Sequence, residues 1–276
     1  MDHIKSVLRS AVRLYCSVPI RGRFRLADIA GRILASHKPD HLQIGEISIP
    51  IDCGVEVYRY MAAGVYEDAN VRHWRRVLRP GNVFIDGGAN VGYMAAIAHS
   101  IVGPSGHVYA VEASPTCRRM LRHYLHADNI TLIEAALADE VRQMRFYDTP
   151  RVVSRGFAAL AAVETPNDGK PTMVDSITVD EIAQKYNIDT IRYLKLDIEG
   201  AEPLAIKGAS RLLSEHRIDF IMVESSFCAS DAKRSLEAAS MLRQFGYSPY
   251  AISAFGNLMA VTADELNGRR LDLVWC

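Results

Sequence analysis

The 276-residue sequence contains few cysteines and has no excess of positive or negative charge. Its five cysteines are widely spaced and none lies in a Cys-x-x-Cys pair, which disfavours both a disulfide framework and a zinc cluster. Lysine plus arginine total 32, as do aspartate plus glutamate, so no overall positive field attracts nucleic acid. We therefore expect reduced cysteines and no nucleic-acid partner.

Long apolar runs are also missing from the chain. A membrane-spanning helix needs about 20 consecutive apolar residues, and no run approaches that length. The first residues, MDHIKSVLRSAVRLYCS, carry arginines where a signal peptide needs an apolar block. These absences predict a cytoplasmic protein without a transmembrane span.

The first 40 residues are basic, with eight lysines or arginines against three aspartates. Ile4, Leu8, Ala11 and Tyr15 recur at helical spacing. Such a helix would lie on the domain, on a second subunit of a homo-oligomer or, as a peripheral contact, on an acidic membrane. We expect residues 1–60 to form an extension of helix and strand, and residues 61–276 to form the main domain.

From residue 80 onward, strand and helix patterns alternate, which is typical of a parallel sheet covered by helices on both faces. Ser114 and Thr178 stand where two of the helices need N-caps. The expected fold class is therefore α/β. Apolar segments predict strands at 83–86, 108–112, 130–134, 191–197 and 220–224, a late pair near Tyr250 and Leu258, and an earlier strand or hairpin arm at 42–51.

Two segments carry weaker patterns. Residues 148–175 have no clear period, and we expect an inserted loop or short hairpin that contacts substrate, because long irregular insertions are often functional. His73 and Trp74 lie in an arginine-rich stretch and are expected on a solvated helix face.

A glycine-rich turn, VFIDGGANVGYMA, occupies residues 83–95. Its glycines let the chain turn sharply where the first strand ends, and the helix that follows attracts a negative group to its N-terminus. Two cofactor motifs fit the turn. A degenerate dinucleotide motif would use Gly87, Ala89 and Gly92. The Asp-x-Gly-x-x-x-Gly motif, usual in S-adenosylmethionine enzymes, comprises Asp86, Gly88, Asn90 and Gly92.

Two acids complete the expected cofactor site. Asp86 ends its strand and is expected to accept a hydrogen bond from the cofactor's ammonium, while the turn amides face the cofactor's carboxylate. Glu112 ends the next strand, where a carboxylate takes ribose hydroxyls in both cofactor classes. An NAD(P)-dependent oxidoreductase therefore remains an alternative to an S-adenosylmethionine enzyme at this stage.

A charged row interrupts a later strand in the segment YLKLDIEGAEPLAIKGA, residues 193–209. Alternation along the strand puts Lys195, Asp197 and Glu199 on one side, where a buried parallel strand should be apolar. Charges in such a place cost free energy unless they are paired or used. Because this strand and the first should flank the switch point of the sheet, Asp197 is expected to face a ligand on the glycine turn. A purely structural Lys195–Asp197 ion pair is the alternative.

Six segments together resemble the FkbM-type methyltransferases, a family of S-adenosylmethionine-dependent O-methyltransferases. In order they read FIDGGANVGY, VYAVEASP, AALADE, SITVDEIA, LKLDIEGAE and IMVESS. The resemblance implies a Rossmann-like class I methyltransferase fold, with a seven-stranded, mostly parallel sheet and a reversed last hairpin. It implies methyl transfer to a hydroxyl, often of a sugar, glycan or polyketide. It also implies cofactor contacts at Asp86, Gly88, Ala89, Asn90, Gly92, Glu112, Asp139 and, from a matching GVYE at 64–67, Glu67.

Under this resemblance the charged row has a catalytic role. Asp197 is the expected base or orienter of the acceptor hydroxyl, Lys195 is its partner, and Glu199 belongs to an acidic surround with Glu202 and Glu224. Asp197 and Glu224 end neighbouring strands and, with one more oxygen ligand, would hold Mg²⁺ in a metal-assisted variant. A catalytically silent binding module is the remaining alternative.

Overall fold

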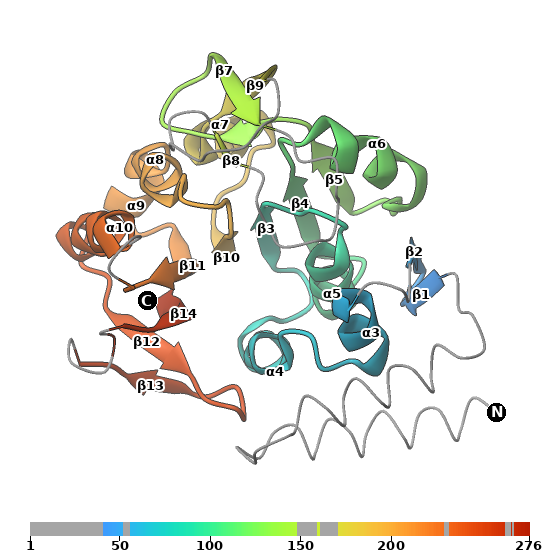
Figure 1. Ribbon diagram of the computed structural model, residues 1–276, viewed down its shortest axis with the longest axis horizontal. Helices are drawn as coiled ribbons and strands as arrows, with labels where there is room; N and C mark the ends of the chain where they lie inside the picture. The colour runs from blue at the N-terminus through green and yellow to red at the C-terminus, as the bar shows by residue number, and fades with distance from the viewer. Residues whose placement is uncertain are drawn as a thin grey trace.

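The structure is a computed structural model that describes residues 41–51, 56–147, 159–160, 171–228, 232–262, 266 and 268–276. Figure 1 shows a central sheet with helices on both sides. The expected N-terminal helix and most of the insertion at 148–175 lie outside the described residues. Within the described residues, no helix combines the length and the apolar character needed to cross a membrane.

The main sheet has eight strands, and β3, the first strand after the N-terminal hairpin, lies in its interior. Neighbours from β11 through β5 are parallel, whereas β14, β12 and β13 pair antiparallel. From edge to edge the order is β13 (Leu258–Ala260), β12 (Pro249–Ile252), β14 (Arg270–Trp275), β11 (Ile218–Ser226), β10 (Ile191–Leu196), β3 (Val83–Gly87), β4 (His107–Val111) and β5 (Ile130–Ile133).

This order confirms the expected α/β class, with one difference in the number of strands. The five parallel strands and the late pair form where they are predicted. The sequence did not predict β14, which enters antiparallel between β11 and β12 and makes the sheet eight-stranded instead of seven-stranded. The C-terminal strand therefore reaches the interior of the sheet.

Helices cover both faces because successive strand residues point to opposite sides. Ile85, Leu194 and Val223 belong to one core cluster, whereas Phe84, Tyr193 and Met222 belong to the other. The helices of the first cluster are α7 (Val179–Lys185), α8 (Glu202–Lys207), α9 (Ser210–Ser214) and α10 (Ala232–Gln244). Those of the second are α3 (Glu56–Ala63), α4 (Asp68–Val77), α5 (Tyr93–Val102) and α6 (Pro115–Tyr124).

Local signals in the sequence place several of these elements. The Ser114 side chain accepts from the Cys117 amide at the start of α6, and Thr178 accepts from the Glu181 amide at the start of α7, which confirms both N-caps. The expected strand or hairpin arm at 42–51 is the hairpin β1 (His41–Ile44) and β2 (Ile47–Pro50), which packs into the same core cluster as α5.

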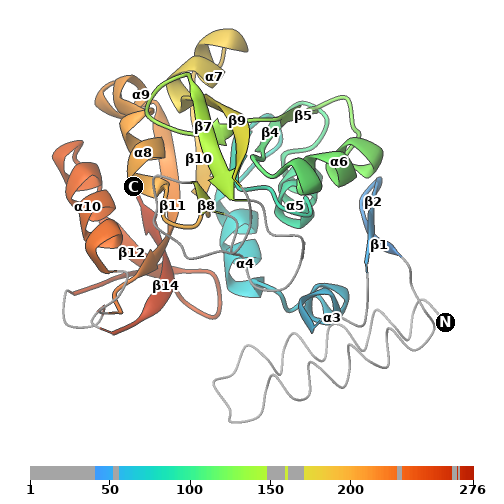
Figure 2. The same cartoon turned by 45° about the horizontal axis from the view of Figure 1, so that its top comes forward.

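A second, four-stranded sheet lies apart from the main one, with β7 and β9 beside α7 (Figure 2). Its strands are β6 (Ala136–Leu137), β9 (Thr172–Ile177), β7 (Gln143–Tyr147) and β8 (Ala159–Leu160). Its apolar side packs on Ile198 and Ala201. The small sheet therefore supports the loop that follows β10.

The chain reverses direction across the sheet between β3 and β10. From β3 it proceeds outward through β4 and β5, then returns to form β10 on the other side of β3. Ligands of open α/β sheets bind outside the carboxyl ends of the strands at such a switch point. The fold therefore directs attention to the residues that follow β3 and β10.

Candidate active site

The glycine turn after β3 packs directly against the chain after β10. The Asp197 amide donates to the Gly87 carbonyl oxygen at 3.2 Å. A Cβ atom on Gly88 would lie 2.0 Å from the Asp197 carbonyl oxygen, and Gly88 has a positive φ of 80°. Only glycine fits there, so the structure brings the turn and Asp197 together as the sequence predicts.

The amides of the turn are already used within the protein. Gly88 and Ala89 donate to the Val111 carbonyl oxygen at 3.0 and 3.1 Å, and the Asn90 amide donates to Glu112 Oε2 at 2.7 Å. The Gly92 amide donates back to Ala89. The expectation that these four amides face a cofactor carboxylate is therefore wrong for this structure, because the turn satisfies its own donors first.

Glu112 joins the glycine turn to helix α6. Its two carboxylate oxygens accept from the amides of Asn90 and Ser114, each at 2.7 Å. The residue is buried next to the turn. The sequence places this acid correctly at the end of β4, and its bonds to the protein orient it.

Asp139 already has two cationic partners. Its carboxylate lies 2.9 Å from Lys207 Nζ and 3.2 Å from Arg142 Nη2. The hydrogen bond from Lys207 is the main reason that the pKa of Asp139 lies below its ordinary value. A cofactor contact at Asp139 would have to share the carboxylate with these cations.

Lys195 holds two aspartates together at the switch point. Its Nζ lies 3.3 Å from Asp86 Oδ1 and 3.2 Å from Asp197 Oδ2. The side chains of Lys195 and Asp86 are 3% and 0% exposed, whereas that of Asp197 is 34% exposed. Burial opposes the charged form of Lys195, yet Asp197 and Asp86 together hold the pKa of Lys195 well above its ordinary value.

Asp86 consequently has no exposed surface and lies against Lys195. Burial raises the pKa of Asp86, and the charge of Lys195 opposes that rise. The position of Asp86 at the end of its strand predicts a direct contact with a cofactor ammonium. The structure instead makes Asp86 the buried partner of Lys195, so a direct contact would require a rearrangement.

Four other carboxyl groups lie near Asp197. Together with it they form the acidic rim: Asp197, Glu199, Glu202, Glu224 and Asp272. Glu224 on β11 stands directly opposite Asp272 on β14. Carboxylate oxygens of Asp197, Glu199 and Glu224 lie within 4.8 Å of one another. Burial and the nearby charge of Asp197 raise the pKa of Glu199 to about 8 and that of Glu224 to about 9. Glu202 accepts from the Ile198 and Gly200 amides, each at 3.1 Å, and so shapes the loop.

Two residues at the start of helix α4, Glu67 and Asn70, also belong to this site. The sequence predicted Glu67 without its partner and did not predict Asn70. Asn70 Nδ2 donates to Asp272 Oδ2 at 2.6 Å and to Glu67 Oε2 at 3.2 Å. Burial and the neighbouring Asp272 raise the pKa of Glu67 to about 8. The GVYE motif indicated Glu67, but no local pattern indicates Asn70 or Asp272 because they are 202 positions apart.

Aromatic side chains form the layer beneath the charges. Phe84, Tyr193 and Phe220 lie side by side on β3, β10 and β11, with stacked rings 5.5 and 5.9 Å apart. His73 and Trp74 of α4 cover them and are buried. The expectation of a solvated face for these two residues is wrong, because the apolar sheet beneath α4 outweighs the arginines beside them in sequence.

Two curated proteins match parts of this chain. The protein-L-isoaspartate O-methyltransferase of Ignicoccus hospitalis is 31% identical over 97 residues, which cover 34% of this chain and 43% of that protein. The enzyme of the same name from Methanothrix thermoacetophila is 39% identical over 62 residues, 22% of this chain and 30% of that protein. The chain therefore spans less than half the length of these curated relatives.

Two solved structures are similar at lower identity. The methyltransferase FkbM of Methylobacillus flagellatus is 16% identical with a TM-score of 0.47, covering 91% of this chain and 59% of that one. The Aeropyrum pernix fibrillarin, solved with S-adenosyl-L-methionine, is 12% identical with a TM-score of 0.41, covering 72% and 68%. The family model described as the methyltransferase FkbM domain matches residues 86–249, which is more than half of the chain, and the protein belongs to that family.

Proposed function

We propose that this protein transfers a methyl group from S-adenosylmethionine to a hydroxyl oxygen of a small molecule or glycan. The observation that carries the proposal is the buried Lys195, which binds Asp86 below and Asp197 above at the switch point of the sheet. Asp197 alone of the three is partly exposed, and it touches the glycine turn through its backbone. Membership of the FkbM methyltransferase domain supplies the reaction class.

The cofactor would lie along the turn between β3 and β4. Glu112 is the residue best placed to accept the ribose hydroxyls, because two backbone amides already hold its carboxylate in place. Gly88, Ala89, Asn90 and Gly92 provide the close backbone surface. Glu67 supplies a carboxyl group near Lys195 for the cofactor's positive end. Asp86 acts through Lys195, and Asp139 would share its carboxylate with its cationic partners.

When bound, the cofactor would supply a methyl group on a positively charged sulfur; the acceptor oxygen would bond to that methyl as its bond to sulfur breaks, and the neutral thioether would leave with the electron pair. Asp197 accepts the hydrogen bond of the acceptor hydroxyl and takes up its proton as the oxygen attacks. Lys195 keeps Asp197 aimed at the crevice. Correct positioning of two reactants supplies about 7–11 kcal/mol, more than the roughly 10²- to 10⁴-fold of a general base, so orientation by Asp197 should contribute most.

A divalent cation would fit the same rim. Asp197, Glu199 and Glu224 offer three carboxylate oxygens within 4.8 Å of one another, the hard oxygen ligands that Mg²⁺ prefers. Such an ion would supply charge stabilisation for a developing alkoxide. Exhaustive chelation tests this form of the reaction, since unchanged turnover in excess chelator excludes it.

The acceptor class follows from the family resemblance, which favours a hydroxyl on a sugar, glycan or polyketide. The two curated relatives are named as O-methyltransferases, which also supports transfer to oxygen. Mass spectrometry across a panel of hydroxylated acceptors tests this, with a gain of about 14 Da marking one methyl in place of one hydrogen. Labelled methyl transfer to nitrogen compounds alone would contradict it.

Calorimetry separates the leading function from the nucleotide alternative. We expect binding of S-adenosylmethionine and no binding of NAD⁺ or NADP⁺ at millimolar concentration. Asp197→Asn should keep cofactor affinity within about threefold and lower turnover at least about a hundredfold, because the amide keeps the shape but accepts no proton. Near-normal turnover of Asp197→Asn would remove Asp197 from this role.

A further inference from the structure

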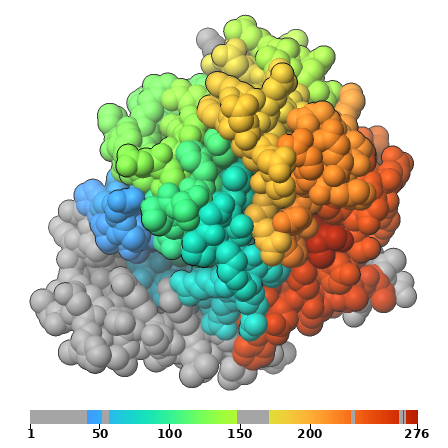
Figure 3. All heavy atoms as spheres, turned by 180° about the vertical axis from the view of Figure 1, so that it is seen from behind, coloured from blue at the N-terminus to red at the C-terminus, as the bar shows by residue number. Residues whose placement is uncertain are grey.

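Helix α4 is held along its length by the C-terminal part of the chain. Figure 3 shows the residues around α4, coloured cyan, against the C-terminal residues in red. Arg72 and Arg76 donate to carbonyl oxygens of the turn at 253–257, each at 3.2 Å. The position of the α4 N-terminus, where it borders the crevice, therefore depends on the last strands.

Asn70 forms the innermost of these links. It is 5% exposed, and its one amide nitrogen has two hydrogens, one for Asp272 and one for Glu67. Asp272 lies on β14 opposite Glu224 of the acidic rim. The Asn70 amide thus joins two carboxyl groups that would otherwise repel each other, and it links α4 to the sheet.

Glu67 is held in a backbone conformation that glutamate rarely adopts. Its φ of 47° and ψ of 35° are left-handed, a region where asparagine, aspartate and histidine are enriched but glutamate is not. Glu67 also stands at the N-cap of α4, yet its side chain makes no capping hydrogen bond. Its carboxyl group accepts from Asn70 instead, so the local backbone holds it near Lys195 and Asp197.

We propose that Asn70 is a positioning residue for the cofactor site, which holds the Glu67 carboxylate in place and is itself held by Asp272. The proposal rests on the function proposed above. Asn70 and Asp272 both lie outside residues 86–249, the part of the chain that the family model matches. The link therefore extends the site to two segments, α4 and β14, that the family assignment does not include.

Cofactor affinity tests this role. Asn70→Ala should raise the Kd for S-adenosylmethionine about tenfold, the loss expected for a hydrogen bond to a carboxylate, while kcat at saturating cofactor stays within about threefold. Asn129→Ala is the matched control. Asn129 is also buried and donates twice, at 2.7 and 3.0 Å, to the carbonyl oxygens of Gly103 and Gly106 at the other end of the sheet. It should destabilise the fold and leave the Kd unchanged.

Two further variants separate positioning from folding. In a Glu67→Ala background, Asn70→Ala should have no further effect on Kd, because Asn70 acts through Glu67. The exchange variant Asn70→Asp/Asp272→Asn restores a donor–acceptor pair between α4 and β14 but removes the Asn70 donor from Glu67. We expect its unfolding midpoint to return toward that of the wild type while the Kd stays about tenfold raised.

The outcomes are distinct. If the wild-type protein does not bind S-adenosylmethionine, the proposed function and this inference both fall. If it binds and Asn70→Ala binds equally well, or if the effects of Glu67→Ala and Asn70→Ala simply add, only the inference falls. A normal Kd in the exchange variant also overturns it, because the link between α4 and β14 would then suffice without Glu67.

Discussion

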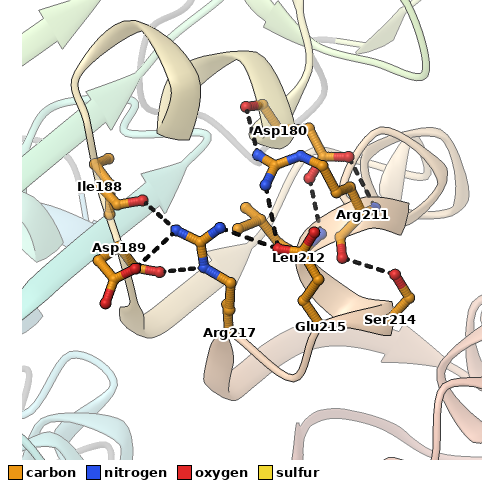
Figure 4. A network of polar contacts seen from close by, with 8 residues as sticks. All are labelled: Asp180, Ile188, Asp189, Arg211, Leu212, Ser214, Glu215 and Arg217. Atoms are coloured by element: carbon orange, nitrogen blue, oxygen red, sulfur yellow. Dashed lines mark hydrogen bonds and ion pairs between the residues drawn. The ribbon is translucent and has the colours of Figure 1, made fainter.

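The two ends of the main sheet carry charge in opposite ways. At the amino ends of β10 and β11, Arg211 and Arg217 share Asp180, Asp189 and Glu215 in the network of Figure 4. At the carboxyl ends, Lys195 is the one lysine or arginine that is buried among the described residues. Five carboxyl groups lie close enough to interact with its charge, Glu67, Asp86, Asp197, Glu199 and Asp272, and two more, Glu202 and Glu224, lie near Asp197.

This difference supports the proposal that the carboxyl end is the binding end of the sheet. In the amino-end network each arginine meets carboxylates and backbone carbonyls, and Asp189 remains 97% exposed, so little desolvation is required. Burying like charges together costs free energy. A protein keeps such a group when it serves a function, and a positively charged cofactor or cation would relieve the repulsion.

Removing the buried cation should be the most damaging change. Lys195→Met leaves Asp86 buried without its ion pair and should lower the free energy of unfolding by about 3–5 kcal/mol, the usual cost of breaking a buried pair. At the amino end, Arg217→Met should cost only about 1 kcal/mol, because its partners can be solvated. Urea denaturation of both variants measures the contrast.

A double variant provides the control for this contrast. Asp86→Leu/Lys195→Met replaces the inner pair with apolar groups and should recover most of the loss, since a well-packed apolar replacement is often neutral. If the double variant is no more stable than Lys195→Met, the loss comes from packing, and the two ends differ less than their charges suggest.

The glycine turn provides a second, somewhat smaller contrast. Gly88 and Gly246 both have positive φ, so replacing either with alanine incurs a similar backbone penalty of about 1 kcal/mol. Only at Gly88 would the new Cβ clash, at 2.0 Å from the Asp197 carbonyl oxygen, whereas at Gly246 the nearest atom is 3.6 Å away on His216.

Gly88→Ala should therefore cost about 1–3 kcal/mol more than Gly246→Ala and should abolish cofactor binding, as calorimetry and urea denaturation can show. Equal stability of the two variants would mean that the turn moves easily, and that its contact with Asp197 does not define the crevice.

Much of the crevice could be predicted because its signals are periodic or local. Strand alternation identified the side shared by Lys195 and Asp197, and the parallel topology placed Asp197 beside the glycine turn. The N-caps Ser114 and Thr178 follow from short-range hydrogen bonds. These features need only a few neighbouring residues and the general rules of α/β sheets.

The remainder depends on contacts between distant segments. The Asn70–Asp272 hydrogen bond joins residues 202 positions apart. Asp272 lies on β14, whose partner strands β11 and β12 are not adjacent to it in sequence. The turn amides appeared available for a ligand because the sequence does not reveal that the Val111 carbonyl oxygen accepts two of them. Likewise, Asp86 is buried against the ammonium group of Lys195. Strand alternation predicts the side of the sheet on which Lys195 lies but not this contact.

The pH dependence of stability offers a third contrast. Glu67 has a pKa of about 8 in the folded protein against an ordinary value of 4.5, so the folded state keeps a proton that the unfolded chain has released. Stability should therefore fall as pH rises from about 4.5 to 8, by at most about 1.4 kcal/mol per pH unit from this group. In Glu67→Gln that part of the slope should disappear.

Urea denaturation of the apoprotein in chelator, at intervals from pH 5 to 9, measures this slope. Glu134→Gln is the control, because Arg122 lowers the pKa of Glu134, and its contribution is lost only as pH falls below the ordinary value. Glu134→Gln should leave the slope above pH 5 unchanged. A Glu67→Gln slope equal to that of the wild type would show that Glu67 is not protonated at neutral pH.

The smallest expected effect concerns backbone strain at the two ends. Glu199 on the acidic rim and His216 beside the amino-end network both have left-handed φ, 54° and 50°. Glycine relieves this strain but loses more entropy on folding, so His216→Gly should change stability by less than about 0.5 kcal/mol. Glu199→Gly also removes one of several crowded carboxyl groups and should gain about 1 kcal/mol, while turnover falls. If Glu199→Gly is less stable than His216→Gly, the crowded carboxyl groups of the acidic rim do not destabilise the carboxyl end of the sheet.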